Sequence, residues 1–155
     1  MAAPVLLAEK VKEEILTVGR RDFSKTIIQD NLYLGRKIIE GNLYFSKTTL
    51  KGDLYLESLT LKGSLYLEGI IIEGDLYLEE SIISGHLFLE GAIVKGNLRF
   101  NNAVLQGTLY LQGISIKGYL FMNTKDGPAL IVVSPEMAPL VHWAVPHTPI
   151  LVVKR

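Results

Sequence analysis

Glycine recurs every eleven residues through most of this 155-residue chain, and this period constrains the fold more than any other feature of the sequence. The recurring glycines are Gly41, Gly52, Gly63, Gly74, Gly85, Gly96, Gly107 and Gly118. The same frame extends backward through Asp30 to Gly19, so that nine complete units cover residues 19–117. A fixed short period is typical of a repeat architecture, in which each unit packs against its neighbours.

Within one unit, numbered 1 to 11 from the glycine, apolar residues recur at positions 3, 5, 8 and 10. Position 3 is leucine in every unit from Leu32 to Leu109, position 5 is Leu or Phe in these units, and position 10 is always aliphatic. Position 8 is mostly small or apolar. A spacing of two within each pair is the period of a β-strand. Each unit is therefore expected to form two very short strands, one at positions 3–5 and one centred on position 9.

A helical alternative exists, because an eleven-residue repeat can produce a right-handed coiled coil. It is disfavoured because glycine in every third turn would cost about 1 kcal/mol each time. The β-branched and aromatic residues also favour strands. The expected fold class is an all-β, single-stranded parallel β-solenoid. One unit would enclose too little room for four inward side chains, so two units, 22 residues, are expected to form one four-sided coil, giving about 4.5 to 5 coils.

The recurring glycine is interpreted as a corner of the coil. Glycine suits a corner that needs a positive φ or a close approach to the next coil. Asp30, which replaces it once, tolerates the left-handed region better than most residues. The corner therefore adds one residue to each pair of five-residue sides.

Inward pairs at positions 3/5 and 8/10, with offsets of five and then six, resemble the pentapeptide-repeat family. The stretch LEGAIVKGNLRF, 89–100, resembles it most, with Ala92 and Val94 as one pair and Leu98 and Phe100 as the next. The extra corner residue and the bulky leucine at position 3 depart from the family pattern. The resemblance covers the repeat region and implies a right-handed β-helix with no particular chemistry. Polymer-forming bactofilin-type solenoids are a looser resemblance.

The segments that flank the repeat are expected to close its ends. Residues 1–18 are interpreted as an N-terminal capping helix, 19–122 as the solenoid and 123–155 as a C-terminal cap or oligomerisation segment. The N-terminal helix is expected from one apolar stripe, formed by Val5, Leu6, Val11, Ile15 and Leu16. A membrane-surface helix is the alternative, which the mixed charge of the polar face disfavours.

Two basic residues occupy inward positions in the first units, Arg21 at position 3 and Lys37 at position 8. They are interpreted as edge effects, with charges that reach solvent. The C-terminal segment is expected to contain a strand at 129–133, a short helix starting at Ser134, and a strand at 150–153. Trp143 is expected to anchor the packing of this segment. The candidate oligomer contact consists of Trp143, Ile150, Leu151 and Val152.

Position 4 of the repeat faces outward and carries mostly aromatic residues. With two units per coil these residues form two ladders on different sides. The first ladder is Tyr33, Tyr55, Tyr77, Arg99 and Phe121; the second ladder is Tyr44, Tyr66, Phe88 and Tyr110. The favoured interpretation is that stacked aromatics stabilise neighbouring coils. The functional alternative is a flat face that docks a second copy or another partner.

Position 6 carries four glutamates, Glu57, Glu68, Glu79 and Glu90. The tube is expected to have an acidic middle, since residues 52–90 hold eight acids and one base, and basic flanks at 19–51 and 91–122. Stacked glutamates repel one another, so a counter-charge is expected nearby or on a partner. The lysines at position 11, such as Lys51 and Lys62, are expected to supply part of it. A solvated charged face is favoured over a binding patch.

No catalytic residue, metal site or cofactor is expected. The chain has no cysteine and three histidines, His86, His142 and His147. His142 and His147 lie close in sequence but have no acidic neighbour to complete a site, and all three are interpreted as surface or packing residues. The regular glycines form neither a nucleophile elbow nor a phosphate loop. Sixteen basic and sixteen acidic residues argue against binding nucleic acid. The N-terminus does not resemble a secretory signal, and a cytoplasmic protein without a membrane span is expected.

The favoured function is a non-enzymatic solenoid scaffold for protein–protein interaction or self-assembly, with a protein partner or a second copy. Many pentapeptide-repeat proteins are scaffolds or bind a protein partner, which the resemblance makes compatible with this function. Some are acidic DNA mimics that bind gyrase, to which the zero net charge is poorly suited. The alternative from another class is a carbohydrate-binding or carbohydrate-cleaving β-helix that uses exposed tyrosines.

Overall fold

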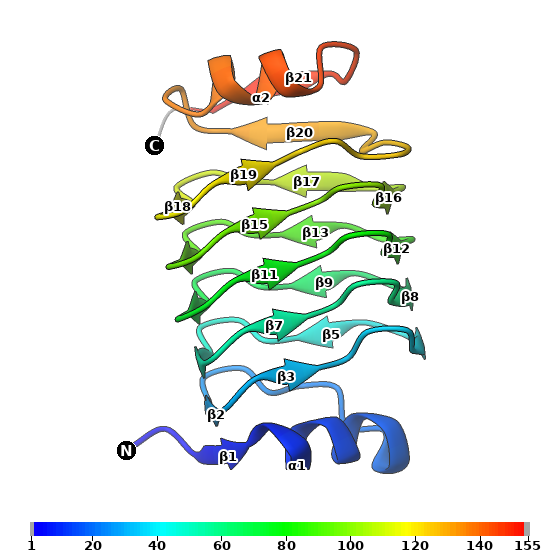
Figure 1. Ribbon diagram of the computed structural model, residues 1–155, viewed down its shortest axis with the longest axis vertical. Coiled ribbons are helices and arrows are strands. Elements are labelled where there is room, and N and C mark those ends of the chain that lie inside the picture. The colour runs from blue at the N-terminus through cyan, green and yellow to red at the C-terminus, as the bar shows by residue number, and fades with distance from the viewer. Residues whose placement is uncertain (1, 154–155) are drawn as a thin grey trace.

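The computed structural model describes residues 2–153 as a parallel β-solenoid with a helix at each end (Figure 1). Residues 1, 154 and 155, which belong to the predicted terminal segments, lie outside the described part. Strands of neighbouring coils in the repeat region pair in parallel at an offset of 22 residues, as in Leu54 with Leu76 and Tyr55 with Tyr77. The prediction that two eleven-residue units form one coil is therefore confirmed.

The strands form four sheets along the tube. Sheet A contains β1 (Val5–Leu7), β2 (Ile27–Gln29), β6 (Thr49–Lys51), β10 (Ile71–Ile72), β14 (Ile93–Val94) and β18 (Ser115–Ile116). Sheet C contains β3 (Leu32–Tyr33), β7 (Leu54–Tyr55), β11 (Leu76–Tyr77), β15 (Leu98–Arg99) and β19 (Leu120–Phe121). Sheet D contains β4 (Ile38–Glu40), β8 (Thr60–Lys62), β12 (Ile82–Ile83) and β16 (Val104–Leu105). Sheet B contains β5 (Leu43–Tyr44), β9 (Leu65–Tyr66), β13 (Leu87–Phe88), β17 (Thr108–Tyr110), β20 (Leu130–Val133) and β21 (Ile150–Val152).

The chain visits the sheets in the order A, C, D and B in every coil. In Figure 1 it runs from left to right along the front strands β3, β7 and β11, and from right to left along the rear strands β5, β9 and β13, while it rises from the N-terminus. The coil is therefore right-handed, as expected. Sheets C and B form the front and rear walls, so they face away from each other.

The core of the tube consists of the side chains at positions 3, 5, 8 and 10, as predicted. Leu54, Leu56, Leu59 and Leu61 represent one complete unit, and each is buried. Hydroxyl groups also enter the core where position 8 is Thr or Ser, and those of Thr26, Thr48 and Ser81 donate to backbone carbonyl oxygens. Ser81, for example, donates through its Oγ to the carbonyl oxygen of Leu78 at 2.7 Å, which removes the cost of burying an unpaired hydroxyl.

Position 7 holds the left-handed turn of every unit, a position for which the sequence predicted no turn. All nine residues at this position have φ between 58° and 68°: Lys25, Arg36, Lys47, Ser58, Gly69, Glu80, Gly91, Asn102 and Gly113. At position 1, the predicted corner, only the first three residues, Gly19, Asp30 and Gly41, have a positive φ. Positive φ therefore belongs mainly to position 7, and the recurring glycines need another explanation.

That explanation is close approach between coils. The amide of Gly85 donates to the carbonyl oxygen of Gly63 at 2.9 Å, and Gly96 and Gly74 form the same bond. A β-carbon built on Gly85 would lie 2.7 Å from both carbonyl atoms of Gly63, closer than van der Waals contact allows. Position 1 is glycine because the backbone of the coil below occupies the place of a side chain.

The turn at position 7 leads to a stability prediction. Lys47 is exposed and has φ of 59°, a conformation that L-residues other than glycine adopt at a cost. We expect Lys47→Gly to raise the free energy of unfolding by about 0.5 to 1 kcal/mol, since glycine removes more strain than it adds chain entropy. Chemical denaturation would measure it. The control is Lys62→Gly in β8, where the backbone is extended and glycine should lower stability; a loss in both variants would contradict the prediction.

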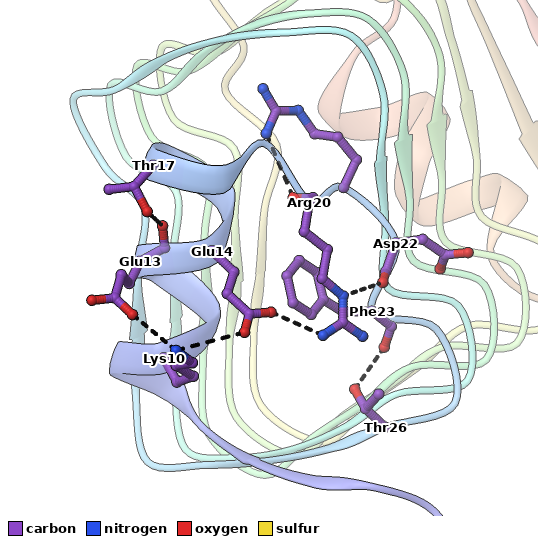
Figure 2. Close-up of polar contacts among 9 residues, drawn as sticks. Lys10, Glu13, Glu14, Thr17, Arg20, Asp22, Phe23 and Thr26 are labelled. Atoms are coloured by element: carbon purple, nitrogen blue, oxygen red, sulfur yellow. Dashed lines mark hydrogen bonds and ion pairs between the residues drawn. The ribbon is translucent and has the colours of Figure 1, made fainter.

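The N-terminal end is closed by α1 (Ala8–Glu13) and the π-helical segment η1 (Glu14–Val18). Figure 2 shows this helix lying across the end of the coils. Ala8, Val11 and Ile15 are buried against the core. The helix is shorter than predicted, because residues 5–7 form β1 and pair with β2. Val5 and Leu16, which were assigned to the buried stripe, are exposed.

Basic side chains hold this cap to the first coil (Figure 2). Arg20 donates through Nη1 to Oε1 of Glu14 at 2.9 Å, and its guanidinium carbon lies 4.3 Å from the ring centroid of Phe23. Arg21 is half-buried and donates through Nη1 to the carbonyl oxygen of Ile15 at 2.8 Å. Arg21 therefore binds the end of the cap instead of only reaching solvent. Lys37 is also half-buried.

The C-terminal end is closed by β20, α2 (Ala138–Ala144) and β21, which confirms the expected strand–helix–strand cap. The helix begins later than predicted. The hydroxyl of Ser134 is buried and accepts a hydrogen bond from the amide of Gly113 at 2.8 Å, so it does not cap α2. The prediction that Trp143 anchors this packing was wrong, because its side chain is 86% exposed. Val141 in α2 and Val145 just after it are the side chains of this helical region that are buried.

Candidate interaction surfaces

The first ladder lies on the outside of sheet C. The ring centroids of Tyr33 and Tyr55, and those of Tyr55 and Tyr77, are 4.6 Å apart, and the rings are nearly parallel. Arg99 continues the stack, with its guanidinium carbon 5.7 Å from the ring centroid of Tyr77 and 4.8 Å from that of Phe121. The residue that interrupts the aromatic pattern therefore preserves the stack through cation–π contacts.

The second ladder lies on the outside of sheet B. Neighbouring rings among Tyr44, Tyr66, Phe88 and Tyr110 have centroids 4.6 to 4.8 Å apart. Because sheets B and C are opposite walls, a single flat partner surface cannot contact both ladders. The inner rings of each ladder lie face to face with their neighbours, so only ring edges point outward there.

Polar groups at position 2 fix the tyrosines and the coils together. The hydroxyls of Tyr55 and Tyr77 donate to Oδ2 of Asp53 and Asp75, each at 3.0 Å. The other oxygen of Asp53 accepts the backbone amide of Asp75 at 2.7 Å. Burial, and then the hydrogen bond to the carboxylate, raises the pKa of both Tyr55 and Tyr77. These tyrosines are therefore held as neutral, structural donors.

His86 also lies at position 2, and its contacts are structural in the same way. Its Nδ1 accepts the amide of Thr108 at 3.0 Å, and its ring packs edgewise against Phe88 and Tyr110. His86 thus takes the place that Ser64, which accepts from the amide of His86, holds one coil below. Among residues 2–153 no group of three or more His, Cys, Asp or Glu side chains could hold a metal ion.

The position-6 glutamates form two stacks, Glu57 with Glu79 and Glu68 with Glu90, at the spacing of one coil. One oxygen each of Glu79 and Glu90 is buried without a hydrogen-bond partner in the described part of the chain. Burial raises the pKa of both carboxyls, and the neighbouring carboxylates below them add to the effect. Arg99 opposes the shift at Glu79.

The lysines at position 11 do not provide the counter-charge that was expected for these glutamates. Lys51 lies 3.3 Å from Glu73 and Lys62 lies 3.9 Å from Glu40. Both acids lie at position 11, so these ion pairs join position-11 side chains of neighbouring coils. The lysines therefore leave the repulsion within the position-6 stacks unrelieved, and Arg99 is the residue that opposes it at Glu79.

The burial of Glu90, together with the repulsion from Glu68 below it, predicts a pH dependence of stability. Because the folded-state pKa of Glu90 is raised, the folded chain binds more protons than the unfolded chain between the ordinary pKa, 4.5, and the raised value. The free energy of unfolding should therefore fall as the pH rises through that window. We expect Glu90→Gln to reduce this slope and to stabilise the protein at neutral pH. Glutamine fits, because Gln112 occupies the same position one coil further on.

The measurement is the midpoint of denaturation across the acid-to-neutral range. Glu136→Gln is the matched control, since Glu136 is exposed in the C-terminal turn and should leave the slope unchanged. A Glu90→Gln variant that is less stable than the native chain at neutral pH would contradict the prediction.

Several large apolar side chains are exposed at the C-terminal end of the chain. Trp143 and Leu140, 64% exposed, lie one turn apart on α2, on the side away from the buried Val141. In β21 and just after it, Leu151, Val152 and Val153 are also exposed. Of the four residues predicted to form an oligomer contact, Trp143, Leu151 and Val152 are therefore exposed, and Ile150 is half-buried. We call Leu140, Trp143, Leu151, Val152 and Val153 the end patch.

Together, the stacked parallel sheets and the two caps define the class of the protein as a capped, right-handed parallel β-solenoid. Comparison with protein-family models, with curated proteins and with solved structures found no match to this chain. Neither α1 nor α2, nor any other helix within residues 2–153, has the length and apolarity needed to cross a membrane.

Proposed function

We propose that this chain is a non-enzymatic solenoid scaffold that acts by docking a protein surface, and that its docking surface is the end patch. The observation that carries the proposal is the exposure of Leu140 and Trp143 on α2. Leu151 and Val152 in β21 are exposed as well. Tryptophan dominates the binding energy of many protein interfaces, because it buries a large rigid apolar surface. An apolar patch of this kind on a folded chain is typical of an interaction site.

The walls of the tube support this proposal by contrast. Their outward side chains are used in contacts between coils: tyrosines stack, position-2 side chains accept backbone amides, and lysines pair along their row. Sugar binding through the tyrosine ladders has less support, because the ring faces that would stack on a sugar are occupied by neighbouring rings. Tyr33, at the end of the first ladder, keeps the most exposed ring.

We also propose that the chain is related to the pentapeptide-repeat solenoids. The four-sided, right-handed coil and the inward pairs support the relationship. The 22-residue coil and the leucine at position 3 are the features by which this chain departs from that pattern.

Photo-cross-linking in the cells that make the protein would test the docking function. A benzophenone amino acid replaces Trp143, and the matched control replaces Ile38, which is 69% exposed on sheet D. The proposal predicts a covalent adduct with a protein, either another copy or a different chain, from position 143 and not from position 38. Adducts from position 38 alone, or from neither position, would contradict it.

A further inference from the structure

We infer that the end patch binds a second copy of this chain, tail to tail across a two-fold axis. This inference rests on the proposed docking function and names its partner. It follows from three properties of the C-terminal end: its charge, its contrast with the opposite end, and the exposed aliphatic residue with which the outward row of sheet B ends.

The first property is the absence of charge. Residues 137–153 include no Asp, Glu, Lys or Arg. A two-fold axis places each patch against an identical patch, so any charge close to the axis would face a like charge. The end patch avoids that repulsion, and the net charge of zero leaves no long-range repulsion between copies.

The second property is the contrast with the N-terminal end. There the exposed apolar side chains, such as Leu7 and Val18, are interspersed with charged ones. Lys10, Glu13 and the half-buried Glu14 form ion pairs with one another and with Arg20. A head-to-tail contact would press these groups onto Trp143 and remove their hydration without a new partner on the uncharged patch. The tail-to-tail arrangement buries apolar surface against apolar surface on both sides.

The third property is the way the second ladder ends. Tyr110 is in register with Val132, and Val132 is in register with Leu151. The outward row of sheet B therefore runs from Tyr44 to Leu151, where the side chain is 51% exposed. The row is aromatic as far as Tyr110 and aliphatic after it. Val132 is buried, so Leu151 is the exposed aliphatic residue with which the row ends, and it adds apolar surface to the end patch outside α2.

A tail-to-tail contact has a defined stoichiometry. Both copies use the same patch, so the contact is isologous and the assembly closes at two chains. A head-to-tail contact would instead add chains without limit. The mass of the assembly therefore distinguishes the two arrangements.

The purified full chain allows a direct test, because Trp143 is its single tryptophan. Sedimentation velocity from submicromolar to high micromolar concentration should show a monomer that becomes a dimer and grows no further. The indole emission should shift to the blue over the same range, as Trp143 leaves water. A monomer at all concentrations, or a mass that keeps increasing, would overturn the inference.

Variants locate the contact. Leu140→Glu and Trp143→Glu should each weaken the dimer roughly tenfold or more, and the emission of Leu140→Glu should stay that of an exposed indole. Both side chains face solvent, so the denaturation midpoint of the monomer should not change. Ile38→Glu, on the wall, is the control and should leave the dimer intact. A dimer that survives both end variants, or one lost in Ile38→Glu, would overturn the inference.

The two proposals fail separately. A pure protein that stays monomeric, together with an adduct between position 143 and a different protein in cells, would overturn the two-fold contact and leave the scaffold function in place.

Discussion

Gly85→Ala is expected to lower the free energy of unfolding by about 3 kcal/mol or more. The new β-carbon would meet both carbonyl atoms of Gly63 and the hydroxyl of Ser64 in the coil below. Neither backbone can move aside easily, because the amide of Gly85 is bonded to the carbonyl oxygen of Gly63. Guanidinium-induced unfolding, followed by circular dichroism, would measure the loss.

Gly91→Ala is the matched control. Gly91 lies in the same coil region, has φ of 65°, and has no atom within 4 Å of a β-carbon built on it. The alanine there should cost only the strain of a left-handed residue, about 1 to 2 kcal/mol. A Gly85→Ala variant as stable as Gly91→Ala would show that the coils are not stacked through the glycines.

Phe100→Ala is expected to cost about 4 kcal/mol of stability. The ring is fully buried at position 5, inside the tube. Its removal loses apolar contacts and leaves a cavity that the strands on either side, tied to neighbouring coils, cannot fill. Denaturant unfolding at a fixed pH would give the difference from the native chain.

Phe88→Ala is the matched control, because it removes a side chain of the same type from the outside of the tube. Phe88 stacks between Tyr66 and Tyr110 and is only half-buried, so its loss should cost about 1 to 2 kcal/mol. The reverse order of the two effects would mean that the inward and outward phases of the repeat have been exchanged.

The sequence carries enough information for the coil, because its evidence is repeated. The pair spacing at positions 3/5 and 8/10 sets which side chains enter the core, and the need for enclosed volume sets two units per coil. Both predictions are confirmed by the burial of the core and by the register of 22 residues. The two ladders and their separation onto different walls follow directly from that register.

The turn at position 7 could not be found in the same way. Its residues range from Lys47 and Glu80 to Gly69, so the backbone conformation leaves no single residue type as a signal. Gly69, Gly91 and Gly113 are the residues of this position whose type is typical of a left-handed turn. Glycine at position 1 was the stronger signal, but its cause is the carbonyl of the next coil, which is a contact between residues 22 apart.

The ends were predicted less well than the wall, since they are not repeated. Helical periodicity correctly indicated a cap at the N-terminal end, yet it placed Val5 in a helix where pairing with β2 makes it a strand. At the C-terminal end the helix start signal at Ser134 indicated the helix of the cap but set its beginning too early. Tryptophan usually anchors a core, so Trp143 was assigned to packing. Only the orientation of α2, with Val141 inward, shows that the indole faces solvent.

The 22-residue coil also governs how the length of such a protein can change. An insertion of one full coil would leave every later residue on its original wall, with both ladders and the C-terminal cap in register. An insertion of a single eleven-residue unit would preserve the sequence pattern but rotate everything after it by half a coil. The second ladder would then continue on the wall of the first, and α2 would meet the tube from the opposite side. Viable length variants should therefore differ by whole coils, although the repeat visible in the sequence is half as long.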